Sequence, residues 1–202
     1  MRSIILASAS PRRAELLRQM GLSFTVSPVD IDETPRPDEP AVTYVERLAR
    51  EKANAGLARA EHPDCLVIGS DTSVVLNDVI LGKPRDVADA TAMLASLSGQ
   101  IHKVMTVVAL AGTHGCFARL VVTDVRFKVL SAVEIDAYCE TGEPMDKAGA
   151  YGIQGKGGIF VNGLWGNYSA VVGLPLDETA ALLMEAGEPV WLHWSQSGEE
   201  PL

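Results

Sequence analysis

The pattern of apolar and polar positions predicts a chain that mixes strands with helices, and therefore a mixed α/β protein. Apolar or alternating stretches predict strands at residues 4–6, 23–27, 65–68, 101–111, 117–130, 159–161 and 190–193, with a hairpin over 74–81. Apolar residues at helical spacing predict helices that begin after Ser10 and Ser131 and that span 41–60, 86–97 and 177–186. The acidic, proline-rich residues 28–40 and the glycine-rich residues 149–158 are predicted loops.

The first predicted strand leads into a serine-rich turn and then into two arginines at a helix start. Ser10 can cap that helix, and Pro11 suits its first position. The free N–H groups of the first turn and the positive end of the helix dipole favour an anion there. Arg12 and Arg13 add fixed charge and forked donors suited to phosphate oxygens. The segment therefore predicts an anion site, and a capped helix with two surface arginines is the alternative.

Further polar clusters fall at the predicted ends of elements, over residues 30–34, 50–52, 69–72, 82–85 and 146–155. Asp71 follows the apolar run at 65–68, so we expect it at the mouth of a buried strand. A carboxylate in that position can bind a divalent metal or activate water, and its alternative role is to cap a turn. Taken singly, Glu33 and Lys52 are typical of solvated surface residues, and Lys83 is open between the two interpretations.

Composition narrows the class of protein. The net charge of −9 disfavours nucleic acid as a partner, because such binding needs a basic surface. No apolar run reaches the roughly 18 residues of a membrane span, so no membrane partner is expected. The cysteines, Cys65, Cys116 and Cys139, form no metal or redox motif, which favours reduced thiols in the cytoplasm. We expect one domain over residues 1–194 and a loose tail over 195–202.

Two carboxylates and several cations near predicted element ends favour hydrolysis of a phosphate ester or phosphoanhydride. A triphosphate repels an attacking hydroxide, and cations must neutralise that charge in the transition state. The chain lacks the P-loop sequence of many nucleotide hydrolases, and the glycines at 152–158 are too loosely spaced for a dinucleotide-binding fingerprint. The histidines show no metal-ligand spacing, and we interpret them as incidental.

Taken in order, these clusters resemble the Maf family of nucleotide pyrophosphatases. The matching strings are residues 6–17 (LASASPRRAELL), 32–34 (DET), 48–53 (LAREKA), 69–72 (GSDT), 82–84 (GKP), 97–99 (LSG), 146–155 (DKAGAYGIQG) and 172–176 (VGLPL). Each string is weak alone, but the ordered set over residues 3–185 is specific. The resemblance implies an elongated mixed β-sheet with two α/β lobes around a central cleft, as in inosine-triphosphatase-like folds.

The resemblance also implies an activity, which is hydrolysis of a nucleoside triphosphate to the monophosphate and diphosphate. Asp71 would be the proton acceptor that activates water, and Glu33 and Asp71 would hold a divalent metal cation, Mg²⁺, Mn²⁺ or Co²⁺. The implied phosphate-binding residues are Ser8, Arg12, Arg13, Lys52 and Lys83. The family implies a homodimer as well.

Within the family, Arg12, Thr72 and Gln154 are similar to the branch that acts on dTTP, UTP and modified pyrimidine triphosphates. Another branch, which prefers 7-methyl-GTP, carries Trp, Gln and Glu at these positions. A glutamine amide both donates and accepts, so it can pair with uracil or thymine. Two alternatives stay open. One is a nucleotide-binding regulator of septum formation and cell-division arrest without significant turnover, and the other is an enzyme for purine triphosphates such as ITP.

Overall fold

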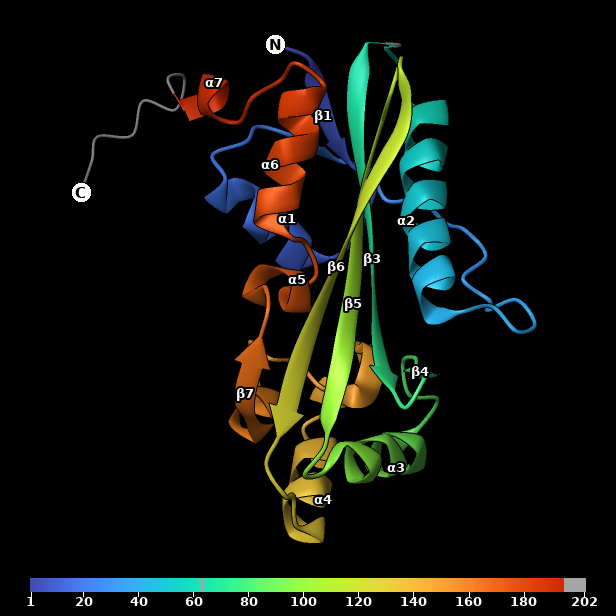
Figure 1. Cartoon of the computed structure of the whole chain (residues 1–202), viewed down its shortest axis with the longest axis vertical. Helices are drawn as coiled ribbons and strands as arrows, with labels where there is room; N and C mark the ends of the chain where they lie inside the picture. The colour runs from blue at the N-terminus through green and yellow to red at the C-terminus, as the bar shows by residue number, and fades with distance from the viewer. Residues whose placement is uncertain (63, 195–202) are drawn as a thin grey trace.

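The computed structural model of the chain describes residues 1–62 and 64–194, so the tail predicted at 195–202 lies outside the described residues. Within the described part, one seven-stranded mixed sheet has the order β2-β1-β3-β5-β6-β7, and β4 pairs with β3 (Figure 1). The strands are β1 (Ser3–Leu6), β2 (Thr25–Val26), β3 (Cys65–Leu76), β4 (Val79–Leu81), β5 (Ile101–Gly112), β6 (Gly115–Phe127) and β7 (Val161–Trp165). β1 runs parallel to β2 and β3, and the remaining pairs are antiparallel.

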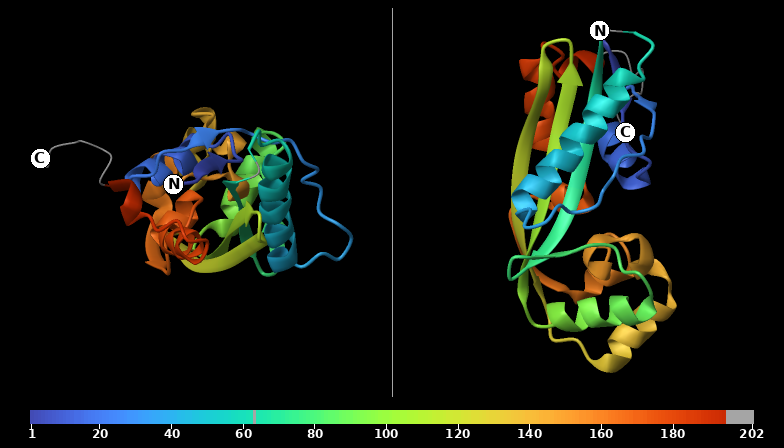
Figure 2. Two further views of the ribbon diagram at one scale, coloured as in Figure 1. Left: turned by 90° about the horizontal axis from the view of Figure 1, so that it is seen from above. Right: turned by 90° about the vertical axis from the view of Figure 1, so that its right-hand side faces the viewer.

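The helices cover the sheet in two separate regions. They are α1 (Pro11–Gln19), α2 (Ala41–Ala58), α3 (Val87–Leu97), α4 (Ala132–Glu140), α5 (Tyr168–Val172), α6 (Leu176–Glu185) and α7 (Trp191–Trp194). Figure 1 and Figure 2 show α2 on one face of the upper half and α1 and α6 on the other, whereas α3 and α4 form the lower end. This arrangement confirms the elongated mixed sheet with two α/β lobes. None of the described helices is long and apolar enough to cross a bilayer.

Each lobe has its own apolar core. In the upper lobe, alternate residues of β5 point to opposite faces, so Val107 packs beneath α2 and Val108 packs toward α1 and α6. In the lower lobe, Leu94, Phe127 and Phe160 form the centre of the core. The strands β3, β5 and β6 are long enough to run through both lobes and connect them (Figure 1).

The local capping signals are confirmed. The Ser10 side chain accepts a hydrogen bond from the backbone N–H of Arg13, with Pro11 in the first turn of α1. Ser131 and Glu134 form a capping box at the start of α4. Asp86 caps α3 by accepting from the N–H of Asp89. These interactions need only nearby residues, which is why the sequence identifies them.

The expectation that Asp71 lies at the mouth of a strand that ends near Gly69 is wrong. β3 continues to Leu76 because β5 pairs with it residue by residue, from Val67 opposite Ala111 onward. Gly69 does not form a turn, but it lets α2 approach closely, since a Cβ there would overlap the backbone of Ala49 and Ala53. Asp71 therefore stands in mid-strand. Its side chain reaches a cleft because the parallel pairing of β1 with β3 ends at Leu6 opposite Ile68.

The last part of the chain also differs from the prediction. The strand predicted at 190–193 is the short helix α7, in which the N–H of His193 donates to the carbonyl of Val190 at 3.0 Å. The indole N–H of Trp194 donates to the carbonyl of Met20 at 2.7 Å and ties this helix to the end of α1. A short apolar run does not distinguish strand from helix, so a tertiary contact decides the outcome.

Two further segments between α4 and α6 differ. The strand predicted at 159–161 begins only at Val161. The predicted loop at 149–158 overlaps two short 3₁₀ turns, Ala148–Ala150 and Lys156–Phe160, and a third, Glu143–Asp146, precedes it. The sequence pattern did not predict α5.

Candidate active site

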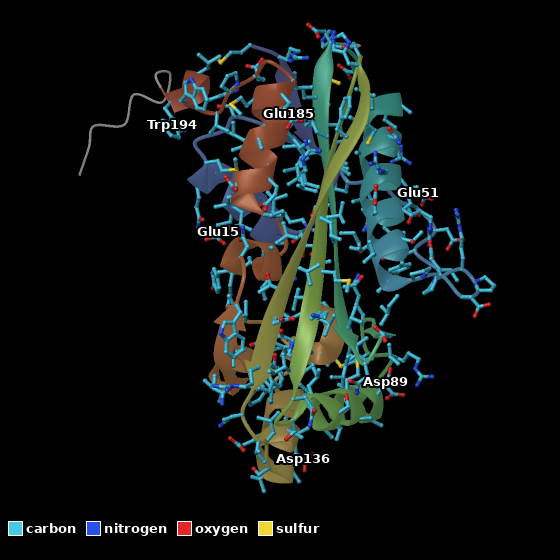
Figure 3. The ribbon with its side chains drawn as sticks, in the orientation of Figure 1. Glu15, Glu51, Asp89, Asp136, Glu185 and Trp194 are labelled. Atoms are coloured by element: carbon cyan, nitrogen blue, oxygen red, sulfur yellow. The ribbon has the colours of Figure 1, made fainter. Side chains whose placement is uncertain are left out.

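A cleft of about 930 Å³ lies where the two lobes meet. It is lined by every residue that the sequence analysis selected, namely Ser8, Arg12, Arg13, Glu33, Lys52, Asp71, Thr72, Lys83 and Gln154. Many of the acidic side chains that give the chain its negative charge lie elsewhere. Glu15, Asp136 and Glu185, for example, are exposed on the outer surface of the molecule (Figure 3). The cleft is lined by five cationic and four acidic side chains, so it lacks the acidic excess of the chain as a whole.

The serine-rich turn after β1 forms the upper wall of the cleft. Ser8 is buried, and its hydroxyl accepts hydrogen bonds from the N–H of Ser10 at 3.2 Å and from Nη1 of Arg13 at 3.2 Å. The turn is therefore held in one conformation before α1 begins. The N-terminus of α1 and its arginines line the same space, as an anion site requires.

Besides its contact with Ser8, Arg13 is fixed by two acceptors from distant parts of the chain. Its Nε donates to the carbonyl of Gly173 at 2.8 Å, and its Nη2 lies 3.4 Å from the hydroxyl of Thr72. The Thr72 hydroxyl also lies 3.0 Å from the hydroxyl of Thr106, which donates to the carbonyl of Ala170 at 2.7 Å. Burial lowers the pKa of Arg13, and the charge of Asp71 partly offsets this effect. Arg13 consequently supplies a positive charge at a defined position, with much of its hydrogen-bonding capacity already used within the protein.

At the centre of the cleft, one ammonium group bridges two carboxylates. Nζ of Lys52 donates to Oδ1 of Asp71 at 2.8 Å and lies 2.6 Å from Oε1 of Glu33. Lys52 and Asp71 are buried, whereas the Glu33 side chain is 46% exposed. Lys52 comes from the centre of α2 and Asp71 from β3, so two rigid elements set this distance.

The two carboxylates differ in how tightly they hold a proton. Burial raises the pKa of Asp71 above its ordinary value, despite the opposing charges of Lys52 and Arg13. Partial burial also acts to raise the pKa of Glu33, but its hydrogen bond and ion pair with Lys52 outweigh this and lower it. A raised pKa makes Asp71 a better proton acceptor than an ordinary aspartate, whereas Glu33 stays ionised.

The loop that carries Glu33 is held against α2. The hydroxyl of Tyr44 donates to the carbonyl of Glu33 at 2.9 Å, and Nη2 of Arg47 donates to the carbonyl of Thr34 at 3.2 Å. Arg47 is itself fixed by Glu39 at 2.7 Å. Burial, together with the nearby carboxylates, raises the pKa of Tyr44 to about 12, so the phenol stays protonated and keeps donating. Tyr44 and Arg47 could not be predicted from the sequence, because their roles depend on a loop contact that no motif encodes.

The residues present fit a divalent cation that shares its ligands with a substrate. The described residues contain no group of three or more His, Cys, Asp and Glu side chains placed to hold a metal. Asp71 and Glu33 nevertheless bring two carboxylates together in the cleft, since both pair with Nζ of Lys52. Mg²⁺ is commonly bound by one or two carboxylates together with substrate phosphates and water, which is the donor set that this cleft and a triphosphate would provide.

The lower wall of the cleft carries Lys83 and Gln154, which are both exposed. Glu143, Lys147 and Tyr151 line this wall too, although the sequence analysis gave them no role. Nζ of Lys147 donates to the carbonyl of Glu143 at 2.8 Å.

The interpretation of His102 as incidental needs revision as well. It is buried, and its Nε2 lies 2.8 Å from the hydroxyl of Tyr151. Burial lowers the pKa of His102 to about 4, so the ring is neutral. His102 thus supports the lower wall from behind, through Tyr151.

Comparison with known proteins adds independent information. The family model described as "Maf-like protein" matches residues 3–186. A dTTP/UTP pyrophosphatase from Shewanella oneidensis is 58% identical and covers 92% of this chain and 98% of its own length. Proteins of the same name from Myxococcus xanthus (56% identical, 96% of each chain) and Hahella chejuensis (52% identical, 94% of this chain and 95% of its own) match similarly.

Among solved structures, a nucleoside-triphosphatase/dITP/XTP pyrophosphatase from Mycobacterium abscessus aligns with a TM-score of 0.43 and 18% identity. It covers 62% of this chain and 74% of its own. That likeness covers only part of either chain.

Proposed function

Because this chain belongs to the Maf-like protein family, we propose that it hydrolyses dTTP and UTP, and modified pyrimidine triphosphates, to the monophosphate and diphosphate. The observation that carries the proposal is the buried carboxylate of Asp71, which lies against Lys52 in a cleft lined with cations. Phosphoanhydride hydrolysis needs both a base for water and positive charge for the phosphates.

In the proposed reaction, Asp71 accepts a proton from a water molecule as the water oxygen attacks the α-phosphorus. The bond between the α-phosphorus and the bridging oxygen breaks, and diphosphate leaves with that oxygen. Lys52, Lys83 and Arg12 balance the phosphate charge. Ser8 and Arg13 hold the turn at the start of α1 in position to receive phosphate oxygens. Asp71 returns its proton to solvent after the monophosphate forms.

A divalent cation, Mg²⁺, Mn²⁺ or Co²⁺, held by Glu33 and Asp71, would supply further charge neutralisation on the phosphoanhydride oxygens. Lys52 already holds these two carboxylates together through its Nζ. It therefore keeps the pair from separating by mutual repulsion before the substrate enters. The Tyr44 contact fixes the loop on which Glu33 stands.

We assign base selection to Gln154, with Arg12 and Thr72 contributing. Gln154 is exposed and lines the lower wall of the cleft, whereas Ser8 and Asp71 belong to the upper lobe. A nucleotide whose phosphates lie at the turn after β1 would extend its base toward that wall. The Gln154 amide can donate to O4 and accept from N3–H of uracil or thymine.

The proposal also covers the oligomeric state of the protein and the compartment in which it acts. It places a homodimer in the cytoplasm, with residues 1–194 as one catalytic unit. Cys65, Cys116 and Cys139 are free thiols, which fits a reducing compartment. Light scattering on the purified full chain tests the dimer directly.

Diphosphate release from a panel of nucleoside triphosphates, with Mg²⁺, Mn²⁺ or Co²⁺, tests the function. We expect release from dTTP and UTP, and loss of turnover by about 10²–10⁴-fold in Asp71→Asn. Asp136→Asn, on the outer surface of α4, is the matched control and keeps full activity. Nucleotide binding without diphosphate release would favour the regulator instead, and preference for ITP would favour the purine enzyme.

A further inference from the structure

The glycine-rich segment that carries Gln154 is braced from below by two side chains for which the proposed reaction has no use. We call residues 152–157 the Gln154 loop. Its glycines, Gly152, Gly155 and Gly157, form a pattern that fits no nucleotide-binding fingerprint. The two supporting side chains are Glu143, which follows α4, and Tyr138, within α4.

Glu143 accepts hydrogen bonds from the far end of the loop. Its Oε2 accepts from the backbone N–H of Lys156 at 3.0 Å, and its Oε1 accepts from that of Gly157 at 3.2 Å. The hydroxyl of Tyr138 donates to the same Oε1 at 2.9 Å and accepts from the N–H of Gly152 at 3.2 Å. The two side chains thus bind both ends of the loop and also bind each other.

The glycines of the Gln154 loop leave room for the side chains that contact it. A Cβ on Gly155 would overlap the carboxylate of Glu143, and one on Gly157 would lie 2.6 Å from the Tyr138 hydroxyl. A Cβ on Gly152 would lie 2.7 Å from the side chain of Lys147. Gly155 and Gly157 therefore allow the loop backbone to approach Glu143 and Tyr138.

We propose that Glu143 and Tyr138 act together as the Glu143–Tyr138 clamp, which fixes the Gln154 loop and so positions Gln154 for recognition of the base. The inference rests on the proposed function, because it assumes that Gln154 contacts the base. Glu143 and Tyr138 are positioning residues here. They act through the loop backbone, and Gln154 meets the substrate.

The charge of Glu143 strengthens the clamp. Hydrogen bonds from backbone N–H groups to an ionised carboxylate are stronger than those between neutral groups. Partial burial acts to raise the pKa of Glu143, but the N–H groups of Lys156 and Gly157 and the Tyr138 hydroxyl outweigh this and lower it. The carboxylate thus stays ionised in the neutral pH range where the clamp is needed.

The variants Glu143→Ala, Glu143→Gln and Tyr138→Phe test the clamp in the full chain. Glu134→Ala is the matched control, because Glu134 also accepts backbone and side-chain hydrogen bonds at α4 but does not contact the loop. Hydrogen exchange at residues 152–157 reports the loop directly. We expect Glu143→Ala to speed this exchange at least about tenfold, Glu143→Gln to have a smaller effect, and Glu134→Ala to leave it unchanged.

Kinetics separate the base from the phosphates. We expect Glu143→Ala to raise the KM for UTP about tenfold or more, with a smaller change in kcat, because it weakens binding at the base. Inorganic tripolyphosphate has no base, so we expect its inhibition constant to be the same for Glu143→Ala and the wild type. Combining Glu143→Ala with Gln154→Ala adds little beyond Gln154→Ala alone, because the clamp acts through Gln154.

If hydrogen exchange at residues 152–157 is as slow in Glu143→Ala as in the wild type, the proposal is overturned. A parallel weakening of tripolyphosphate inhibition, or full additivity of the two substitutions, would also overturn it. If Glu143→Ala does not fold, Tyr138→Phe, which keeps the buried ring, decides with the same readouts. Absence of UTP and dTTP turnover in the wild type would instead refute the proposed function, and the exchange experiment would still decide whether the clamp holds the loop.

Discussion

Asp71→Asn should remove activity and, at neutral pH, make the protein more stable. The substitution keeps the shape of the side chain and removes its charge. Asp71 is 7% exposed, and burial raises its pKa, so the folded protein tolerates the charged form less well than the unfolded chain does. The variant loses one charged hydrogen bond, from Lys52 at 2.8 Å, but Lys52 keeps Glu33 as a partner.

The direction of the pKa shift gives the sign of the stability effect. A charged hydrogen bond contributes about 1.5–3 kcal/mol, whereas burial of an ion disfavours folding by several kcal/mol. Because the pKa of Asp71 is raised, burial outweighs the attraction of Lys52 and Arg13. We therefore expect a gain on the order of 1 kcal/mol in the free energy of unfolding at pH 7. For a chain of 202 residues this raises Tm by about 2–4 °C.

The stability difference should depend on pH. Since the folded state binds the proton more tightly than the unfolded chain, the wild type loses stability as pH rises from the ordinary value of 3.8 through the raised pKa. The variant has no such loss, so its advantage is full at neutral pH and disappears below 3.8.

Thermal unfolding from pH 3 to pH 8, beside diphosphate release, measures both effects. Asp124→Asn is the control, because its ion pair with Lys103 is exposed and contributes little. A Tm for Asp71→Asn that falls well below the wild type at pH 7 would refute the reasoning about burial, and near-normal turnover would remove Asp71 from the role of base.

Three other perturbations have expected outcomes. Gln154→Glu should lower kcat/KM for UTP and dTTP, because a carboxylate repels O4 of the base. Unchanged selectivity among nucleotides would mean that another residue recognises the base. His102→Gln should make the stability of the protein less sensitive to acid. The buried neutral ring has a pKa of about 4, so the wild type loses roughly 2–4 kcal/mol of unfolding free energy as pH falls from 6.5 to 4. Urea unfolding across that range measures this loss, and equal acid sensitivity in both proteins would contradict it. Gly69→Ala should destabilise the upper lobe by about 3 kcal/mol or more, because the new methyl overlaps the backbone of α2; a Tm within a few degrees of the wild type would show that α2 can move away.

Much of the site could be predicted because its residues belong to strings that stand at recognisable places along the chain. Arg12 and Arg13 follow a strand and begin a capped helix, and local rules identify both, whereas the family resemblance selected Ser8. Lys52 and Glu33 look like ordinary surface residues when taken singly. The resemblance to a family selected them, and the structure shows that Lys52 pairs with both Glu33 and Asp71.

The rest could not be predicted because it depends on contacts between distant segments. A glycine inside an apolar stretch signals either a turn or a close approach, and only the packing of α2 shows that Gly69 is the second case. Tyr44 and Glu143 act on backbone groups of loops, and such acceptors and donors have no sequence signature. Trp194 reaches Met20 from the other end of the chain, which is why α7 escaped prediction.

The continuity of β3, β5 and β6 has a mechanical consequence. Proteins that open and close around a ligand usually do so at a few flexible residues between their lobes. Here, strands of 12 or 13 residues cross the waist of the molecule in register, so rotation at one point would break a ladder of backbone hydrogen bonds. The sheet is therefore rigid along its length, and the distance between the two lobes is nearly constant. Recognition of a nucleotide must therefore use a cleft whose two walls are already in place, and not the closure of one lobe against the other.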